Sequence, residues 1–240
     1  MTQRMIAISD IHGEVDLLNQ LLELTEYDPV QDQLILLGDY VDRGSDARET
    51  LERVMELVDQ GAVALLGNHE DLMLTALTSG RESDWNRWLK VNGGLATLQS
   101  YGFTREQLIT LSGEDFHLPD LHNEVLDRHL AFIRTLRLYY ETPNYICVHA
   151  GIEPGKTPEE CSRRELIWIR EAFHNGYDGD KFVVFGHTPT FYLYHDNSNF
   201  EIYYGVNRII GIDGGAVYGG QLNALDLTTG TAYSVRKVQA

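Results

Sequence analysis

The chain has 240 residues, of which 43% are hydrophobic and 23% are charged, as in an ordinary soluble globular protein. Its 36 acidic and 19 basic residues give a formal net charge of −17 at pH 7, which argues against a nucleic-acid partner because such a surface repels a phosphate backbone. No apolar stretch approaches the roughly 18 residues that span a bilayer, and the sequence becomes charged too early for a secretory signal, so we expect a cytoplasmic protein without a membrane partner.

The first third of the chain alternates apolar runs with amphipathic ones. Strands are predicted over three short apolar runs, residues 5–9, 34–37 and 63–66. Each run is followed by a loop and then by a helix, which begins near residue 14, near residue 46 and near residue 70. Strands that alternate with helices favour a parallel sheet, and the loops after such strands are where these folds place their sites.

The rest of the chain divides into a helical part and a strand-rich part. Residues 71–140 have a mostly helical pattern, interrupted by the sequence Asn-Gly-Gly at 92–94. Strands are then predicted over 145–148, 182–185, 201–204, 208–212, 222–227 and 231–236, with a helix over 163–173 and hairpin turns at 197–199 and 229–230. We therefore expect an α/β sandwich of one domain, residues 1–240, with a helical insertion at about 71–140.

Five short segments share one format, in which an apolar strand ends and His, Asp or Asn follows at once. They are IAISDIHG, LILLGDYVDRG, VALLGNHE, YICVHAG and FVVFGHT. In an extended segment residues two apart point to the same side, so Asp10 and His12 can hold one ion. Oxygen and imidazole ligands together suit Mn, Fe or Zn. Gly38, Gly67 and Gly186 stand just before the polar residues, where a tight turn leaves no room for a Cβ.

Each segment alone has a plainer interpretation. A single His after a strand is more often a hydrogen-bonded core residue than a ligand, and a lone D-R-G fits a turn in which Asp bonds its own backbone. Core packing does not explain why five polar groups in order interrupt good strands. The five segments together therefore indicate one shared site.

The order of these motifs resembles the PPP-type metallophosphoesterases. The resemblance consists of D-x-H-G, G-D-x-V-D-R-G, G-N-H-E, a later His and G-H-T, and it spans Asp10 to His187. The family includes protein Ser/Thr phosphatases, their compact bacterial and phage relatives, and symmetrical dinucleoside tetraphosphate hydrolases. It implies a calcineurin-like sandwich of two mixed β-sheets flanked by helices, and a site for two divalent metal ions, with Mn²⁺ expected first and Fe or Zn as alternatives.

The resemblance also implies a role for each residue that matches a motif. The implied metal ligands are Asp10 and His12 for the first ion, Asp39 as a bridge between the two, and Asn68, His149 and His187 for the second. Arg43 would clamp the phosphate oxygens, together with Arg170, which is placed from a W-x-R pattern alone. His69 would be the general acid, and Asp42 would orient it and favour its charged form.

The implied reaction needs this set of groups. Two cations lower the pKa of a shared water, so that a hydroxide forms near neutral pH, and they polarise the phosphoryl oxygens. The hydroxide attacks phosphorus in line with the leaving oxygen. The equatorial phosphoryl oxygens match the planar fork of a guanidinium group. A protonated His then gives its proton to the leaving group, which typically contributes about 10²–10⁴-fold.

Three functions differ in the substrate that the site would accept. The leading hypothesis is a phosphomonoesterase acting on phosphoserine, phosphothreonine and also phosphotyrosine in proteins, or on a small phosphoester, because Asp42 and Glu70 are present. Symmetrical tetraphosphate hydrolases resemble this pattern but lack the aspartate at that position and have Asp after the motif His. The second hypothesis is such a hydrolase, and the third is a phosphopeptide-binding module with a degenerate site. The oligomeric state is left open, with a monomer as the default.

Several residues stay outside the predicted site. Asp213, in G-I-D-G-G, faces the site or forms a plain turn, and both interpretations are kept. Trp85, Trp88 and the Asn-Gly-Gly sequence are assigned to core and loop in preference to a substrate wall. The two cysteines have no metal-ligand spacing, so we expect them only to be packed.

Overall fold

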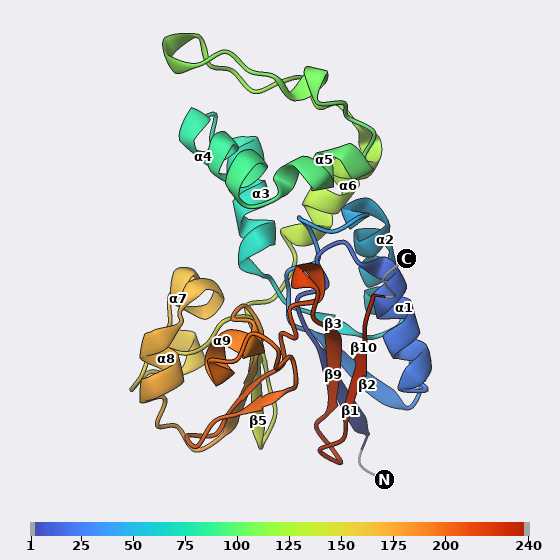
Figure 1. The fold of residues 1–240 in the computed structure, drawn as a ribbon, viewed down its shortest axis with the longest axis vertical. Coiled ribbons are helices and arrows are strands. Elements are labelled where there is room, and N and C mark those ends of the chain that lie inside the picture. Colours follow the sequence, from blue (N-terminus) through green and yellow to red (C-terminus); the bar gives the residue numbers. More distant parts are fainter. Residues whose placement is uncertain (1–2, 238–240) are drawn as a thin grey trace.

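Two five-stranded sheets form the centre of the molecule in the computed structural model, which describes residues 3–237 (Figure 1). The first sheet has the order β10-β9-β1-β2-β3, with bounds Arg4–Ile8 (β1), Asp32–Leu36 (β2), Val63–Ala64 (β3), Leu222–Asp226 (β9) and Ala232–Val235 (β10). The second has the order β4-β5-β6-β8-β7, with bounds Tyr139–Glu141 (β4), Tyr145–Val148 (β5), Phe182–Phe185 (β6), Tyr203–Tyr204 (β7) and Ile209–Gly211 (β8).

Both sheets are mixed, as predicted. β1, β2 and β3 run parallel, and so do β5, β6 and β8. Antiparallel strands β9 and β10 complete one sheet, while β4 and β7 lie at the edges of the other. Because the parallel strands of a sheet end at the same edge, the loops that follow β1, β2 and β3 are brought together, and those after β5 and β6 form a matching set.

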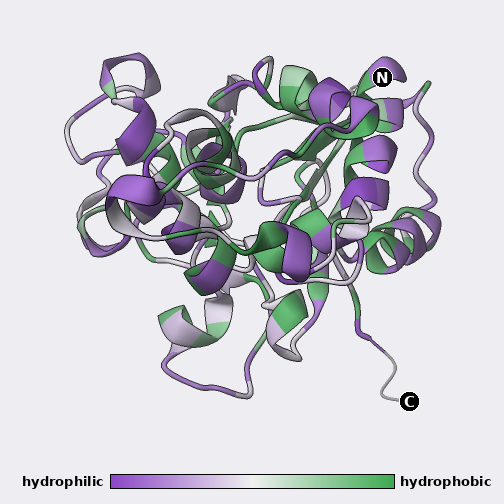
Figure 2. Cartoon of the chain, turned by 90° about the horizontal axis from the view of Figure 1, so that it is seen from above, coloured by the Kyte–Doolittle hydropathy of each residue, from purple (hydrophilic) through white to green (hydrophobic). Residues whose placement is uncertain are grey.

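Side chains along each strand point alternately to the two faces of the sheet, and this divides the core into two layers. In β1, Ile6 and Ile8 belong to the core beneath the helices, whereas Ala7 belongs to a second core. That second core also contains Ile35 of β2, Cys147 of β5 and Val184 of β6, so it lies between the two sheets. Strands buried on both faces are continuously apolar, and Figure 2 shows them green between helices that are partly purple.

Helices cover the outer face of each sheet (Figure 1). The first sheet carries α1, Val15–Leu24, and α2, Ala47–Asp59. The side chain of Asp46 caps α2 by accepting from Glu49 N at 2.9 Å. The second sheet carries α7 (Arg163–Trp168), α8 (Glu171–Gly176) and α9 (Thr190–Tyr194). No helix within residues 3–237 is long and apolar enough to cross a membrane.

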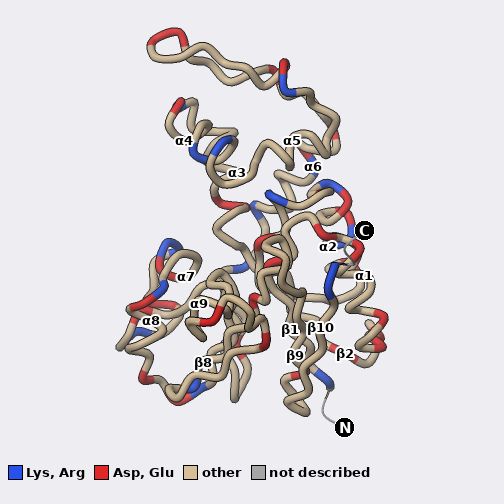
Figure 3. Tube along the Cα trace, viewed as in Figure 1, with Lys and Arg blue, Asp and Glu red and all other residues tan. Residues whose placement is uncertain are grey.

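A helical segment connects β3 to β4 at the top of Figure 1. It consists of α3 (Asn68–Thr78), α4 (Glu82–Asn86), a π-helical turn (Arg87–Val91), α5 (Gly94–Ser100) and α6 (Glu124–Ile133). Between α5 and α6, residues 101–123 form an arm with two short 3₁₀ turns, Glu106–Leu108 and Gly113–Asp115, that extends beyond the helices. Acidic residues, red in Figure 3, occur in this arm and on the helices of both sheets.

Some predicted elements differ from the structure. The helix predicted over 163–173 is two helices, because the chain is extended at Ile169 and leaves helical geometry at Arg170. Helix α9 and strand β4 were not predicted. The turn at 229–230 connects β9 to β10 as expected, but residues 197–199 connect α9 to β7 and form no hairpin.

Candidate dinuclear metal centre and phosphate site

The loops that follow the central strands surround a cavity of about 270 Å³. Seven of the ten predicted site residues line it: Asp10, Asp39, Arg43, Asn68, His69, Arg170 and His187. The other three, His12, Asp42 and His149, lie directly behind this wall and contact its residues through hydrogen bonds or close approaches. The structure therefore brings the whole predicted set together.

The backbone at this site is unusual. Among residues 3–237, nine residues other than glycine have positive φ, and six of them are predicted site residues: Asp10, His12, Asp39, Asp42, Arg43 and His187. This left-handed conformation costs free energy for a residue with a Cβ, and such strain gathers at functional sites. Gly186 adds a close approach, since a Cβ there would lie 2.0 Å from Asp10 Oδ2.

The first group of potential ligands forms around one oxygen of Asp39. His12 Nε2 lies 3.6 Å from Asp39 Oδ2, and His69 Nε2 lies 3.9 Å from the same oxygen. These three residues satisfy the geometry of a metal-binding cluster. His12 Nδ1 donates to Val41 O at 2.7 Å, which leaves the Nε2 lone pair on the side of Asp39 Oδ2 and Arg43.

The second group uses the other oxygen of Asp39. His149 Nε2 lies 3.4 Å from Asp39 Oδ1 and 2.9 Å from Asn68 Oδ1, and His187 Nδ1 lies 2.7 Å from the same amide oxygen. Asp39, His149 and His187 form a second potential metal cluster. Asp39 is thus common to both groups.

The atoms of the second group fit a cation. His149 Nδ1 donates to Leu37 O at 2.8 Å, so its Nε2 can donate only if the ring is charged. Burial lowers the pKa of His149, which keeps the ring neutral and turns a lone pair towards the oxygen of Asn68. Burial likewise lowers the pKa of His187, whose Nδ1 lies beside the same oxygen. Lone pairs that converge in a buried space are the arrangement that a metal ion stabilises.

Buried carboxylates point to the same conclusion. Burial raises the pKa of Asp39 well above its ordinary value, and repulsion from Asp10 and Glu70 adds to the increase. Burial and the charge of Asp10 likewise raise the pKa of Asp213, whose carboxylate lines the cavity. Divalent cations would offset this accumulation of negative charge.

Asp10 differs from the other predicted Asp and His ligands in its hydrogen bonds and in lying outside both clusters. Its two carboxylate oxygens accept the backbone N–H of His187 at 3.1 and 3.0 Å, and Ser9 Oγ donates to it as well. It belongs to neither three-residue cluster, whereas His69, which was predicted to be a general acid, belongs to the first. The Asp10 carboxylate therefore links the loop after β1 to the loop after β6.

Glu70 anchors the loop that carries Asp39. Its side chain is fully buried and accepts backbone N–H groups of Asp39, Tyr40 and Val41 at 2.9, 2.7 and 3.2 Å, and of Gly67 at 3.0 Å. Burial raises the pKa of Glu70 to about 7 in spite of these donors. Sequence reasoning used Glu70 only to separate two families, and missed that it holds the loop.

His69 and Asp42 form a buried pair beside the cavity. His69 Nδ1 lies 2.6 Å from Asp42 Oδ2, which leaves Nε2 facing the cavity. Trp88 Nε1 donates to both oxygens of Asp42 at 3.0 and 3.1 Å, and Thr97 Oγ1 donates to Oδ1 at 2.7 Å. Burial raises the pKa of Asp42 to about 7 and lowers that of His69.

Trp88 and Thr97 were missed as parts of the site. Trp88 is fully buried, as the core interpretation of the helical segment requires, but its indole N–H is directed at the aspartate. Nothing in the sequence around Thr97 signals a contact with a residue 55 positions earlier. Only the folded position of α5 against the loop after β2 creates it.

Both predicted phosphate clamps line the cavity. Arg43 Nη1 donates to His12 Nε2 at 2.6 Å, and its guanidinium lies 5.4 Å from the ring centre of Tyr218. Arg170 Nη1 donates to Thr188 Oγ1 at 2.8 Å, next to His187. The neighbouring Arg163 instead pairs with Asp71 at 2.5 Å. The break between α7 and α8 is what turns Arg170 towards the cavity.

Comparison with known proteins identifies the family. The sequence profile of the calcineurin-like phosphoesterases matches residues 3–211. The chain belongs to this family. It is 30% identical over 221 residues to serine/threonine-protein phosphatase 1 of Salmonella typhimurium, covering 90% of this chain and 88% of the relative. As a PPP-type metallophosphoesterase and a metal-dependent hydrolase of phosphoesters, it carries the residues of a potential dinuclear metal site.

Other similarities concern tetraphosphatases. The chain is 31% identical over 185 residues to the symmetrical bis(5'-nucleosyl)-tetraphosphatase of Aromatoleum aromaticum, covering 76% of this chain and 57% of that protein. The chain thus spans little more than half the length of this relative. A crystal structure provisionally assigned to a diadenosine tetraphosphatase superposes with a TM-score of 0.70 at 20% identity, covering 100% of this chain and 96% of the other. That likeness establishes the fold.

Proposed function

We propose that this chain is a protein serine/threonine phosphatase that also accepts phosphotyrosine. The observation that supports this substrate class is the buried pair of His69 and Asp42, at 2.6 Å. An alkoxide leaving from phosphoserine needs a proton, whereas a nucleoside diphosphate leaving from a tetraphosphate is stable as an anion and needs little help. The similarity to a phosphatase of nearly the same length supports the same choice.

The cavity residues divide the work of the reaction. Two bound divalent cations, for which we propose Mn²⁺, would supply a water of lowered pKa and polarise the phosphoryl oxygens. We propose that Asp10, His12, Asp39, Asn68, His149 and His187 hold them. Arg43, which donates to His12 Nε2 in the structure, would release that nitrogen to the metal and turn its planar fork to the phosphate oxygens, together with Arg170.

Proton transfer is the task of His69. Its Nε2 faces the cavity, while Asp42 fixes the ring through Nδ1. The negative charges of Asp42 and of a bound phosphate both favour the imidazolium form, which gives its proton to the leaving oxygen. Because Trp88 and Thr97 belong to the helical segment, we further propose that residues 71–140 are an insertion within one domain that completes this acid.

A second function has its own support. The similarity to symmetrical tetraphosphatases covers three quarters of this chain, so hydrolysis of a dinucleoside polyphosphate remains the alternative. Both functions would use the same cavity and the same metals, and they differ in the leaving group of the reaction.

One assay separates the two functions. The protein is treated with a chelator, Mn²⁺ is added back, and phosphoserine and phosphotyrosine peptides are compared with diadenosine tetraphosphate and an aryl phosphate. Metal-dependent release of phosphate from peptides that exceeds cleavage of the tetraphosphate supports the phosphatase. Faster cleavage of the tetraphosphate overturns it and favours the alternative.

A further inference from the structure

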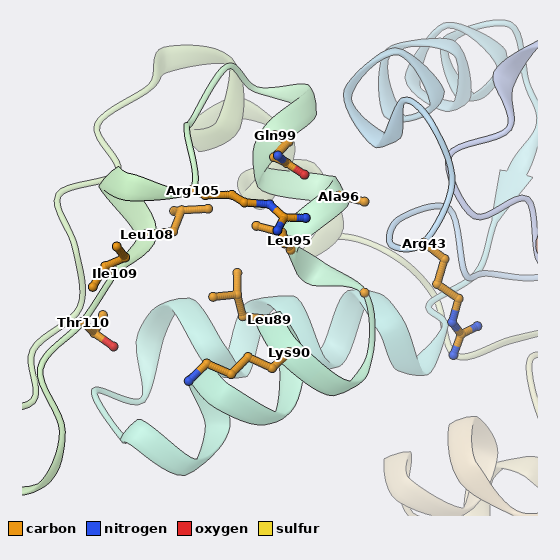
Figure 4. Close-up of a pocket in the computed structure, with 11 residues that line it drawn as sticks. Arg43, Leu89, Lys90, Leu95, Ala96, Gln99, Arg105, Leu108, Ile109 and Thr110 are labelled. Carbon is orange, nitrogen blue, oxygen red and sulfur yellow. The ribbon is translucent and has the colours of Figure 1, made fainter.

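A second cavity, of about 680 Å³, lies in the helical segment next to the catalytic one. We call it the lateral pocket, and its walls include Arg43, Leu89, Lys90, Leu95, Arg105 and Leu108. Figure 4 shows Arg43 at one end of it and Ile109 and Thr110, from the arm, at the other, with Arg105 extended over Leu95.

The lateral pocket is positively charged in an acidic protein. The chain has 36 acidic and 19 basic residues, yet Arg43, Lys90 and Arg105 line this pocket and no carboxylate does. Among the ion pairs formed within residues 3–237, none includes any of these three cations. Cations without a carboxylate partner on one surface favour an anionic ligand.

The apolar part of the pocket is aliphatic. Leu89 and Leu108 are buried, at 7% and 4% exposure, and Leu95 is half-buried beside them. No aromatic side chain lines the pocket, so it lacks the ring that commonly stacks on a nucleotide base. It also lacks a carboxylate to accept from ribose hydroxyls. These walls suit an aliphatic side chain better than a nucleoside.

The lateral pocket adjoins the catalytic cavity. Arg43 lines both, and Asn92 of the catalytic cavity is followed in the chain by Gly93 of the pocket. Arg43 N also donates to Gly93 O at 3.4 Å. A phosphoresidue bound at Arg43 therefore has the pocket directly beside it, within reach of the next residues of its own chain.

We propose that the lateral pocket binds the peptide segment adjacent to the phosphoresidue, with an aliphatic side chain against Leu89 and Leu108 and an anionic one attracted by Lys90 and Arg105. This inference rests on the proposed function, which it deepens by naming the preferred substrate. The anion is a carboxylate of Asp or Glu or a second phosphate, since guanidinium and ammonium groups bind both.

The test compares matched phosphoserine peptides. One carries Glu and Leu within three positions of the phosphoserine, a second has Gln in place of Glu, and a third has a second phosphoserine there. kcat/KM is measured for the wild type, for Lys90→Gln combined with Arg105→Gln, and for Arg134→Gln. Arg134 is exposed at the end of α6 and lines neither cavity, so its variant controls for the loss of charge.

The wild type and Arg134→Gln are expected to prefer the Glu peptide over the Gln peptide by about three- to tenfold, the range that two exposed ion pairs supply. The double variant is expected to lose this preference, and the third peptide shows which anion is favoured. A Glu-to-Gln ratio near one in the wild type, or a ratio unchanged in the double variant, overturns the pocket assignment while peptide dephosphorylation leaves the proposed function standing.

The failure of the proposed function gives a different result. Cleavage of diadenosine tetraphosphate without dephosphorylation of any peptide overturns both the phosphatase and the peptide assignment. A decrease in that cleavage in the double variant would then assign the lateral pocket to a nucleotide.

Discussion

Polar groups around the catalytic cavity are almost fully buried, with Asp39, Asn68 and His69 each 2% exposed, whereas Lys90 and Arg105 of the lateral pocket are exposed. The buried groups have fixed partners from several strand ends, and many sit on strained backbone. The exposed cations have no carboxylate partner among the ion pairs of residues 3–237. The catalytic cavity is thus lined by buried, hydrogen-bonded groups, whereas the charged groups of the lateral pocket are exposed.

This difference assigns different tasks to the two regions. Buried and hydrogen-bonded groups keep their geometry for any substrate, and their electrostatic interactions are strong because water is excluded. Exposed cations are screened by water and salt, so each contributes little and can only bias the choice among substrates. Large effects on catalysis are therefore expected from the first region and small ones from the second.

Metal removal should have the largest effect. Chelation is expected to lower phosphatase activity by at least about 10³-fold, because several kcal/mol of transition-state stabilisation are lost. Added Mn²⁺ should restore the wild type, whereas Asp39→Asn, which removes the shared carboxylate, should stay inactive at the same metal concentration. The measurement is the initial rate on an aryl phosphate. Full activity in excess chelator would contradict the two-metal assignment.

The next effect concerns the general acid. Asp42→Asn should lower kcat on a phosphoserine peptide by about 10²–10³-fold, because His69 loses the carboxylate that stabilises its charged form. The aryl phosphate, whose leaving group needs less protonation, should lose much less. Asp46→Asn makes the same chemical change at the N-cap of α2 and serves as the control. Equal losses on both substrates would show that Asp42 does not act through proton transfer.

Glu70 tests whether the catalytic loops also stabilise the fold. Glu70→Gln places an amide NH₂ against backbone N–H groups that now bond a carboxylate, and we expect a loss of about 2–4 kcal/mol in the free energy of unfolding. Urea denaturation measures the change, and Glu49→Gln, exposed on α2, is the matched control. A change below that of the control would mean that the loop is held by other contacts.

A pair of tryptophans connects the helical segment to the catalytic cavity. Both are fully buried, but Trp88 Nε1 donates to Asp42 while Trp85 Nε1 has no hydrogen-bond partner. Trp88→Phe should lower kcat on phosphoserine by about tenfold, as expected for one lost bond to a charged group. Trp85→Phe makes the same volume change without losing a bond, so a similar loss in both variants would reduce Trp88 to a packing residue.

The fold and the identity of the cavity could be largely predicted from the sequence. Apolar runs ending in Asp, His or Asn mark strand ends, and parallel strands bring those ends together. The sequence pattern therefore predicts that Asp10 and Asp39 share one site, although their strands are separated by a helix. Local pattern is sufficient because this geometry follows from the type of sheet.

Other features depend on contacts that no local pattern records. Thr97 reaches Asp42 across 55 residues only because α5 packs beside the loop. The break at Arg170 interrupts a sequence with good helical character, so tertiary contacts such as that with Thr188 outweigh helix propensity. The lateral pocket likewise depends on where the arm of residues 101–123 returns over α5, and Arg43 is far in sequence from Lys90 and Arg105.

The smallest expected effect lies at the other end of the strands, away from both cavities. Arg4 Nε and Nη2 donate to Asp32 at 2.9 and 2.5 Å, and the hydrogen bond from Arg4 holds the pKa of Asp32 below its ordinary value of 3.8. A depressed folded-state pKa gives stability that is present above the unfolded pKa and is lost as the pH falls through the folded one.

Arg4→Gln should therefore lower the free energy of unfolding by about 0.5–1 kcal/mol at pH 7, the size of a partly exposed ion pair. The difference from the wild type should decrease once the pH falls below about 4, since Asp32 becomes protonated in both proteins. Urea midpoints between pH 7 and the lowest pH at which the fold persists measure it, with kcat expected to remain unchanged. A difference independent of pH would show that Arg4 stabilises β1 through its bonds to the carbonyls of Thr25 and Glu26 and not through Asp32.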